Sequence, residues 1–161
     1  MTTPHCPMCK GTDLNWQARH DIAQRIGSTP IRIRLPCVAC RSCGERVVDG
    51  DVISRGELEV ARVLAKRNVL SPESFRFVRM AIGLQSKQLA MILSVQPETV
   101  SRWEHGQRDV DPTAWSLLRM LVEDHASGRR SIDDVLREVR DLPKPGASAE
   151  EIFVEGPERA A

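Results

Sequence analysis

Two patterns of hydrophobic positions divide the chain into an extended front part and a helical remainder. Apolar residues alternate with polar ones over residues 14–18 and 31–35, which is the period of a strand with one buried face. The turn-forming residues 27–30 (Gly-Ser-Thr-Pro) lie between these two runs. The pattern therefore predicts a hairpin or a small sheet of two to three strands, with Asp49-Gly50 as a second turn.

Six helices are predicted where apolar positions recur every three or four residues. The first is expected from Ser54, at capping-box spacing from Glu57, to about Arg67. Ser71-Pro72 and Asp111-Pro112 each supply an N-cap followed by proline at the first helical position. Start and stop residues of the same kind mark the remaining helices. The predicted helices after the first cover residues 71–82, 86–93, 97–104, 111–127 and 131–142.

Four of the five cysteines form two C-x-x-C pairs, Cys6-Pro-Met-Cys9 and Cys40-Arg-Ser-Cys43. Two such pairs can surround a metal ion with four thiolates, as in structural zinc sites. Gly11 and Gly44 follow the pairs closely, as expected where the backbone turns tightly around a metal. We therefore predict one zinc ion per chain, whereas reduced core cysteines and a redox or iron site are the alternatives.

The fifth cysteine, Cys37, forms a competing C-x-x-C pair with Cys40. It continues the apolar face of residues 31–35, so we expect it to pack as a small hydrophobic side chain rather than bind the metal. His5 and His20 are expected to be surface residues.

The predicted metal would serve folding rather than catalysis. About 50 residues with few large apolar side chains do not build a stable core unaided. Thiolate-rich zinc sites contribute on the order of 10–16 kcal/mol, which exceeds that deficit. A closed four-thiolate site also leaves no open coordination position, and the sequence offers no nucleophile–base pair, so no enzyme activity is expected.

Residues 74–126 have the helix lengths of a phage-repressor-like helix-turn-helix, with a tight turn at residues 94–96 between two short helices. Its second helix, residues 97–104, would be the recognition helix that faces a DNA major groove. There Glu98 could accept a hydrogen bond from cytosine, and Arg102 could pair with guanine. The full set of expected DNA contacts is Glu98, Thr99, Ser101, Arg102, Lys87 and Arg108. Arg79 and Glu104 are expected to form an internal ion pair.

These elements predict three segments. Residues 1–68 would be a zinc-binding domain with a hairpin and one helix, and residues 69–142 a helix-turn-helix domain for DNA binding and dimerisation. Residues 143–161 are too poor in apolar residues for a core and are expected to be a disordered tail. The expected fold class is mainly α, with a small zinc-stabilised α+β N-terminal domain and a C-terminal five-helix, phage-repressor-like helix-turn-helix.

The distribution of charge is uneven although the net charge is only +1. Residues 1–68 carry eleven Lys or Arg and seven Asp or Glu, whereas residues 69–127 sum to −1 and residues 128–161 to −2. No stretch approaches the roughly 18 apolar residues of a membrane span, and residues 2–6 do not begin a signal peptide. We expect a cytoplasmic protein.

The order of these parts resembles the MqsA/YgiT antitoxin family, which joins an N-terminal zinc domain to a C-terminal Cro/Xre-type helix-turn-helix. The residues that carry the resemblance are the two C-x-x-C pairs with Gly44, the run Arg79–Leu84 (RMAIGL), and the run Val100–Gly106 (VSRWEHG). The resemblance covers residues 4–126 and places the family's base-contacting positions on Glu98 and Arg102. Ser86 departs from the glutamine that many relatives have at the start of the preceding helix.

The resemblance implies an antitoxin of a type II toxin–antitoxin pair. Such a protein forms a homodimer, binds and neutralises a ribonuclease-type toxin through its zinc domain, and represses its own operon by binding double-stranded operator DNA. The hairpin edge at Ile31–Leu35 or the acidic residues of segment 143–161 could bind the toxin. The alternative is a stand-alone repressor of the same architecture without a toxin partner.

Overall fold

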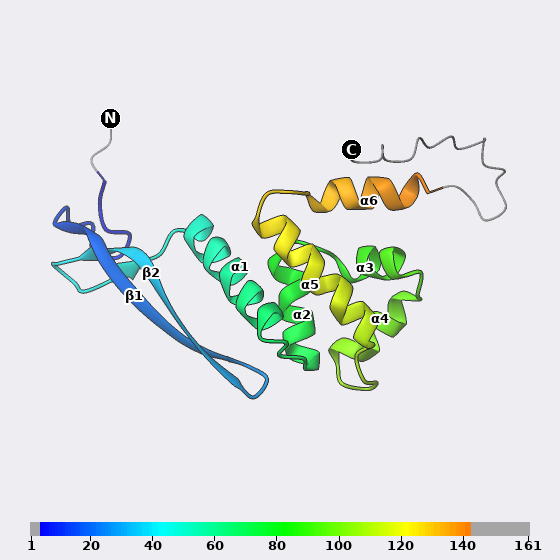
Figure 1. Cartoon of the computed structure of the whole chain (residues 1–161). Coiled ribbons are helices and arrows are strands. Elements are labelled where there is room, and N and C mark those ends of the chain that lie inside the picture. The colour runs from blue at the N-terminus through cyan, green and yellow to red at the C-terminus, as the bar shows by residue number, and fades with distance from the viewer. Residues whose placement is uncertain (1–3, 143–161) are drawn as a thin grey trace, which may run out of the picture.

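The computed structural model describes residues 4–142 as a three-stranded antiparallel sheet followed by six helices (Figure 1). The strands are β1 (Leu14–Ile26), β2 (Thr29–Cys40) and β3 (Arg46–Val47), and they lie in the order β1-β2-β3. The helices are α1 (Gly50–Lys66), α2 (Pro72–Ala81), α3 (Ser86–Leu93), α4 (Pro97–Glu104), α5 (Pro112–Ala126) and α6 (Ile132–Arg140). The predicted disordered tail at residues 143–161 lies outside the described residues.

Strands β1 and β2 form a long hairpin with one irregularity near its metal-binding end. Asn15 pairs with Ala39 and Ala18 pairs with Cys37, so Trp16 and Gln17 together face one residue of β2. This β-bulge changes the alternation of side chains along β1. The simple alternation of the sequence predicted a half-buried Trp16, but the Trp16 side chain is 60% exposed because the bulge turns it outward.

Helix α1 begins earlier than predicted. Its N-cap is Asp49, whose carboxylate accepts a 2.9 Å hydrogen bond from the N–H of Asp51. Ser54, the predicted start, lies inside the helix and donates its hydroxyl to the carbonyl of Gly50 at 3.1 Å. The Asp49-Gly50 pair that predicted a turn is therefore the helix start, because an N-cap aspartate and a turn aspartate have the same sequence signature.

The later helices begin at the capping residues that the sequence predicted. Ser71, Asp111 and Ser131 are the N-caps of α2, α5 and α6, and each side chain accepts hydrogen bonds from backbone N–H groups of the first turn. Around Phe75, which is fully buried, the rings of Trp103 and Trp115 lie at centroid distances of 6.0 and 6.4 Å. These aromatic contacts join α2, α4 and α5 in one core.

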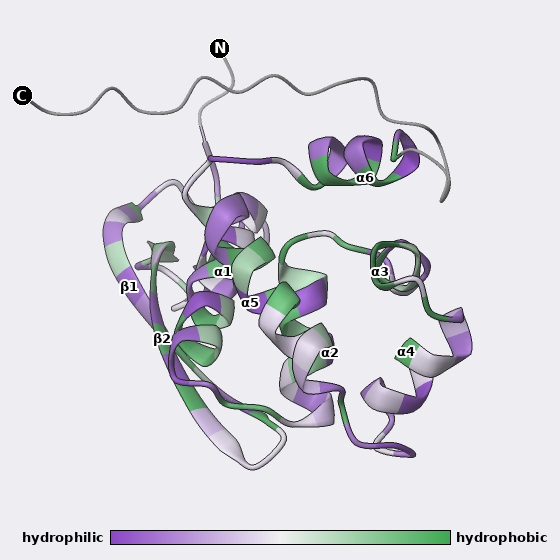
Figure 2. Cartoon of the chain, turned by 45° about the vertical axis from the view of Figure 1, so that its right-hand side comes forward, coloured by the Kyte–Doolittle hydropathy of each residue, from purple (hydrophilic) through white to green (hydrophobic). Residues whose placement is uncertain are grey.

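The predicted fold class is wrong in how it divides the helices. Helix α1 buries Val60, Ala61 and Leu64 in the same apolar core as α2 and α5, so the helical part is a body of six helices (Figures 1 and 2). The structure is thus not a five-helix C-terminal helix-turn-helix fold preceded by a separate domain, although its β-containing N-terminal region agrees with the prediction. The apolar face of α1 was visible in the sequence, but the helices that this face contacts were not. Within residues 4–142, no helix is long and apolar enough to cross a membrane.

Helix α1 also packs against the hairpin, and the two approach closely at Gly56, one turn before Val60. A Cβ atom at Gly56 would lie 2.8 Å from Ile33 Cδ1 and 2.8 Å from Leu35 Cδ2. Both contacts are shorter than van der Waals distance, so any larger residue would force the ends of the Ile33 and Leu35 side chains to move in this packed contact.

We expect Gly56→Ala to destabilise the protein by about 1–2 kcal/mol, because overpacking at β2 outweighs the gain of about 1 kcal/mol in helix propensity. Gly50→Ala, in the same helix, has nothing within 4 Å of its Cβ and should be neutral or stabilising. Urea unfolding of the two variants measures the difference. An equal gain in stability from both would show that Ile33 and Leu35 do not constrain Gly56.

Candidate functional site

The two C-x-x-C pairs lie in loops with the same backbone hydrogen bonds. In the first loop, the N–H of Cys6 donates to the carbonyl five residues later at 2.9 Å, and the Cys6 carbonyl accepts from the N–H four residues later at 3.0 Å. Cys40 makes the same two bonds in the second loop, at 2.8 and 2.9 Å. Each pair of sulfur atoms is therefore presented by the same kind of tight turn.

This turn requires a left-handed residue four positions after its first cysteine. Gly44 occupies that position in the second loop, with φ of +78°, as expected. In the first loop the position belongs to Lys10, with φ of +62°, and not to Gly11 as the sequence suggested. Gly11 has a different role, because its Cβ would lie 3.1 Å from Ser42 Oγ, so its small size lets the two loops approach each other.

The four sulfur atoms of Cys6, Cys9, Cys40 and Cys43 all lie within 4.8 Å of one another. The Sγ atoms of Cys6 and Cys43 are 3.7 Å apart, and those of Cys9 and Cys40 are 3.5 Å apart, so these cysteines are not joined by disulfide bonds. A tetrahedral ion with metal–sulfur bonds of about 2.3 Å requires sulfur–sulfur distances of about 3.8 Å. The cluster can therefore hold a metal ion such as zinc.

Cys37 lies outside this cluster. It is buried in β2, where it pairs with Ala18, and it packs as the small hydrophobic residue that its position in the strand predicted. The phase of a strand separates it from Cys40, because residues three apart point to opposite faces of a sheet.

Local hydrogen bonds favour one thiolate in the cluster. The backbone N–H of Cys43, together with that of Ser42, lowers the pKa of the Cys40 thiol to about 6 although burial opposes this. At Cys43, the backbone N–H of Glu45 lowers the pKa, but the Cys9 thiol, desolvation and the other thiols raise it to about 12. The cluster thus carries negative charge at neutral pH and opposes further ionisation, so it attracts a cation.

A second group of predicted residues lies on α3, α4 and the turn between them. Ser94 ends α3 in a left-handed conformation with φ of +54°, and the N–H of Val95 donates to the carbonyl of Ala90 at 3.0 Å. The apolar side chains of this unit that face the helical core are buried or half-buried: Leu89, Ala90, Leu93, Val95, Val100 and Trp103. Helix α4 is therefore packed on one face and free on the other.

The free face of α4 presents Glu98, Ser101 and Arg102, all of which are exposed. Thr99 is half-buried, so it presents less of its side chain than predicted. His105 follows on the same face, and its Nδ1 lies 2.7 Å from the carbonyl oxygen of Ser101. His105 is not among the predicted DNA contacts, although its spacing of seven residues from Glu98 places it on the same helix face.

The three predicted cations of this region are exposed and carry no ion pair in the described part of the chain. Lys87 lies in the first turn of α3, and Arg102 lies in the last turn of α4. Arg108 is in the loop after α4, where it lines a shallow hollow beside Ser71 and Pro72 at the start of α2. Their positive charges are therefore not neutralised by neighbouring carboxylates.

A buried ion pair fixes α4 against α2. Arg79 Nε lies 2.5 Å from Glu104 Oε1, and the two side chains are only 10% and 6% exposed. The same guanidinium donates to the carbonyl of Leu84 at 2.6 Å, so it also holds the segment that leads into α3. The predicted internal pair is present and positions both helices.

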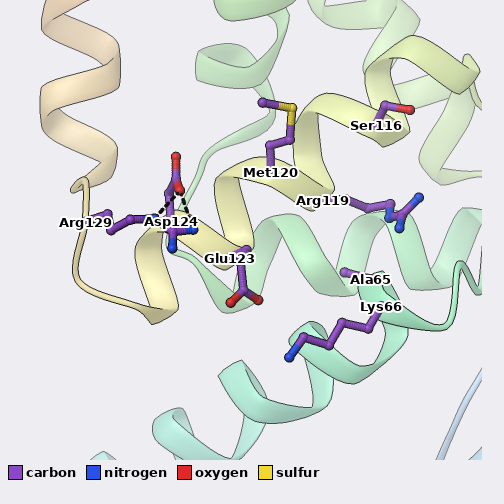
Figure 3. A pocket seen from close by; sticks show the side chains of 8 residues that line it. All are labelled: Ala65, Lys66, Ser116, Arg119, Met120, Glu123, Asp124 and Arg129. Atoms are coloured by element: carbon purple, nitrogen blue, oxygen red, sulfur yellow. Dashed lines mark hydrogen bonds and ion pairs between the residues drawn. The ribbon is translucent and has the colours of Figure 1, made fainter.

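A surface groove of about 550 Å³ lies between the C-terminal part of α1 and α5 (Figure 3). Both of its acidic side chains have ion-pair partners, because Asp124 pairs with Arg129 and Glu123 pairs with Arg62. The Nε of Arg119 is buried and has no hydrogen-bond partner among the described residues. The groove contains none of the predicted metal or DNA-contact residues.

Comparisons with known proteins give no family for this chain. No model of a known protein family matches its sequence, and no curated protein matches it. The cysteine cluster alone does not identify the MqsA/YgiT family, so that relationship stays a prediction from the motifs.

We expect one metal ion per chain, measured by elemental analysis of the purified protein. Cys43→Ser should abolish metal binding and make the hairpin sensitive to protease, because only three thiolates remain. Cys37→Ser is the matched control and should keep the metal. Loss of metal from Cys37→Ser with retention in Cys43→Ser would contradict this ligand set.

Proposed function

We propose that the protein is a sequence-specific DNA-binding repressor whose N-terminal part is stabilised by zinc and which works as a homodimer in the cytoplasm. The observation that carries the proposal is the free face of α4, where Arg102 is exposed without an ion pair to any described residue and Glu98 and Ser101 lie beside it. An exposed short helix after a tight turn can enter a major groove with such side chains directed at the bases.

Zinc is the metal that best suits the four-cysteine cluster. Soft thiolate ligands select zinc, copper(I) or iron–sulfur centres over magnesium and calcium, and four of them close a tetrahedral site. Because the chain needs no redox chemistry for DNA binding, a structural zinc ion fits the proposed role. Its binding would hold the loop at Cys6–Cys9 against the end of β2.

The proposed contacts differ in what they would recognise. Arg102 offers two parallel N–H donors that fit guanine, and Glu98 offers an acceptor for the cytosine amino group. Lys87 and Arg108 would contact phosphates, which carry no sequence information but set the position of the protein on the duplex. Ser101 and the half-buried Thr99 would contribute short contacts to phosphates or thymine methyl groups.

A dimer should bind an inverted repeat whose half-sites are about 10 bp apart, or a multiple of that distance. Arg102→Ala should weaken binding by about 1–3 kcal/mol and relax preference at one base pair, whereas Lys87→Ala should weaken all sequences alike. Footprinting on its own promoter followed by titration measures both effects, with Arg76→Ala on the exposed side of α2 as control. Unchanged affinity in Arg102→Ala would exclude α4 as the reading helix.

The second part of the proposal is that the protein neutralises a toxin encoded beside it. The supporting observation is that one edge of β2 is free. On that side β3 pairs only with Val38 and Ala39, and no described strand covers residues 29–37. A partner sheet could extend this edge by backbone hydrogen bonds. The motifs shared with the antitoxin family give the toxin class, a ribonuclease.

Co-expression with the product of the adjacent gene tests this interaction. The full chain should restore growth, whereas residues 50–161, which keep all six helices but lose the sheet, should not. Rescue by residues 50–161 would move the interaction to the helices or to segment 143–161. If neither chain binds the neighbouring product, the stand-alone repressor is the better assignment.

A further inference from the structure

The outer face of the β1–β2 hairpin is rich in arginine. The inner face, with Ile33 and Leu35, lies against α1 at Gly56. Side chains alternate across a strand, so the residues between them point outward. Four exposed arginines of this outer face line two shallow hollows, and they are Arg19, Arg25, Arg32 and Arg34. The exposed Arg46 of β3 lines one of the same hollows.

Among the described residues, Asp21 is the one carboxylate that lines these two hollows. Asp21 pairs with Arg34 across the strands, at 2.6 and 2.9 Å, and this pairing holds the pKa of Asp21 below its usual range. The remaining four arginines have no ion pair within residues 4–142. The five arginines and Asp21 together therefore have a net charge of +4, whereas the whole chain has only +1.

Backbone carbonyl groups hold three of the four unpaired arginines. Arg46 donates to the carbonyl of Arg19 at 2.8 Å, and Arg25 donates to the carbonyl of Ser28 at 2.8 Å. Arg19 makes a longer bond of 3.4 Å to the carbonyl of Ala18. These bonds orient the guanidinium groups without neutralising their charge, so less side-chain entropy is lost when an anion binds.

We propose that the outer face of the hairpin is a second DNA-binding surface, which binds the phosphate backbone of double-stranded DNA without sequence preference. A guanidinium fits a phosphate with two parallel hydrogen bonds, and a two-stranded ribbon fits the width of a major groove. Single-stranded nucleic acid fits less well, because such sites need several exposed aromatic rings and β1 and β2 supply only Trp16.

This surface is separate from the free face of α4. The hairpin and α4 lie on opposite sides of the six-helix body in both views (Figures 1 and 2). The proposal goes beyond the one made for α4 and does not depend on it, because it concerns duplexes of any sequence.

The test is binding of the full-length, metal-loaded protein to a duplex of unrelated sequence over a range of salt concentrations. The triple variant Arg19→Gln, Arg25→Gln, Arg32→Gln should bind at least about tenfold more weakly at 0.1 M salt. The slope of log K against log salt should become shallower by about 2–3, since each lost phosphate contact removes about 0.9. The matching triple Lys variant should keep most of the slope.

Two further triple variants identify the source of any loss. The triple variant Arg67→Gln, Arg76→Gln, Arg140→Gln removes the same charge from exposed positions outside the hairpin. It should leave the slope of log K against log salt near that of the wild type. Gln at Lys87, Arg102 and Arg108 removes the cations near α4 and tests the separate proposal for that helix. Metal content and circular dichroism confirm that each variant is folded.

If the Arg19, Arg25, Arg32 variant binds the duplex as tightly as the Arg67, Arg76, Arg140 control, the proposal is overturned. A preference of the outer face for polyglutamate over a duplex of equal charge would also overturn it, and would assign the face to an acidic protein surface. Loss of unrelated-duplex binding only in the α4 variant would show that α4 supplies all of the phosphate attraction.

Discussion

The position of the hairpin depends on the contact between Gly56 of α1 and the side chains of β2. The hairpin is too thin to have a core of its own, since one of its faces is charged and exposed. It therefore needs an outside surface on which to bury Ile33 and Leu35, and α1 supplies that surface. Because Gly56 has no side chain, the helix can approach β2 closely while Val60 and Leu64 are buried in the helical core.

The hairpin is fixed at both ends by different interactions. At one end, the four cysteine sulfurs bring the loop at residues 6–9 to the end of β2, within reach of a single ion. At the other end, Ile26 is buried and a Cβ at Gly27 would touch the carboxylate of Glu73 on α2. A metal ion held by the cysteines would thus act on one end of the two strands, and the helical core acts on the other. This arrangement explains how a strand pair with only one apolar face can be long.

Local signals in the sequence were enough for the features that depend on neighbouring residues. The spacing of the cysteines predicted the cluster, and Ser71-Pro72 and Asp111-Pro112 predicted the starts of α2 and α5. These predictions are confirmed because a tight cysteine loop and a helix cap are each determined by a few adjacent residues.

Features that depend on a second segment of the chain were not predictable in this way. The apolar face of α1 gave no indication that it joins the later helices, so the predicted five-helix C-terminal fold was wrong. The bulge at Trp16 depends on the pairing with β2. In each case a tertiary contact outweighs a local preference.

The free face of α4 and the outer face of the hairpin depend on different interactions. Helix α4 is held by the pair of Arg79 and Glu104, and breaking a buried pair of this kind costs about 3–5 kcal/mol. That pair lies within the six helices and makes no contact with the cysteine cluster. The hairpin face depends on the cysteine loops and on Gly56 instead. Disruption of the cysteine cluster would therefore act first on the cationic hairpin and leave the support of α4 in place, so the two surfaces can be lost independently.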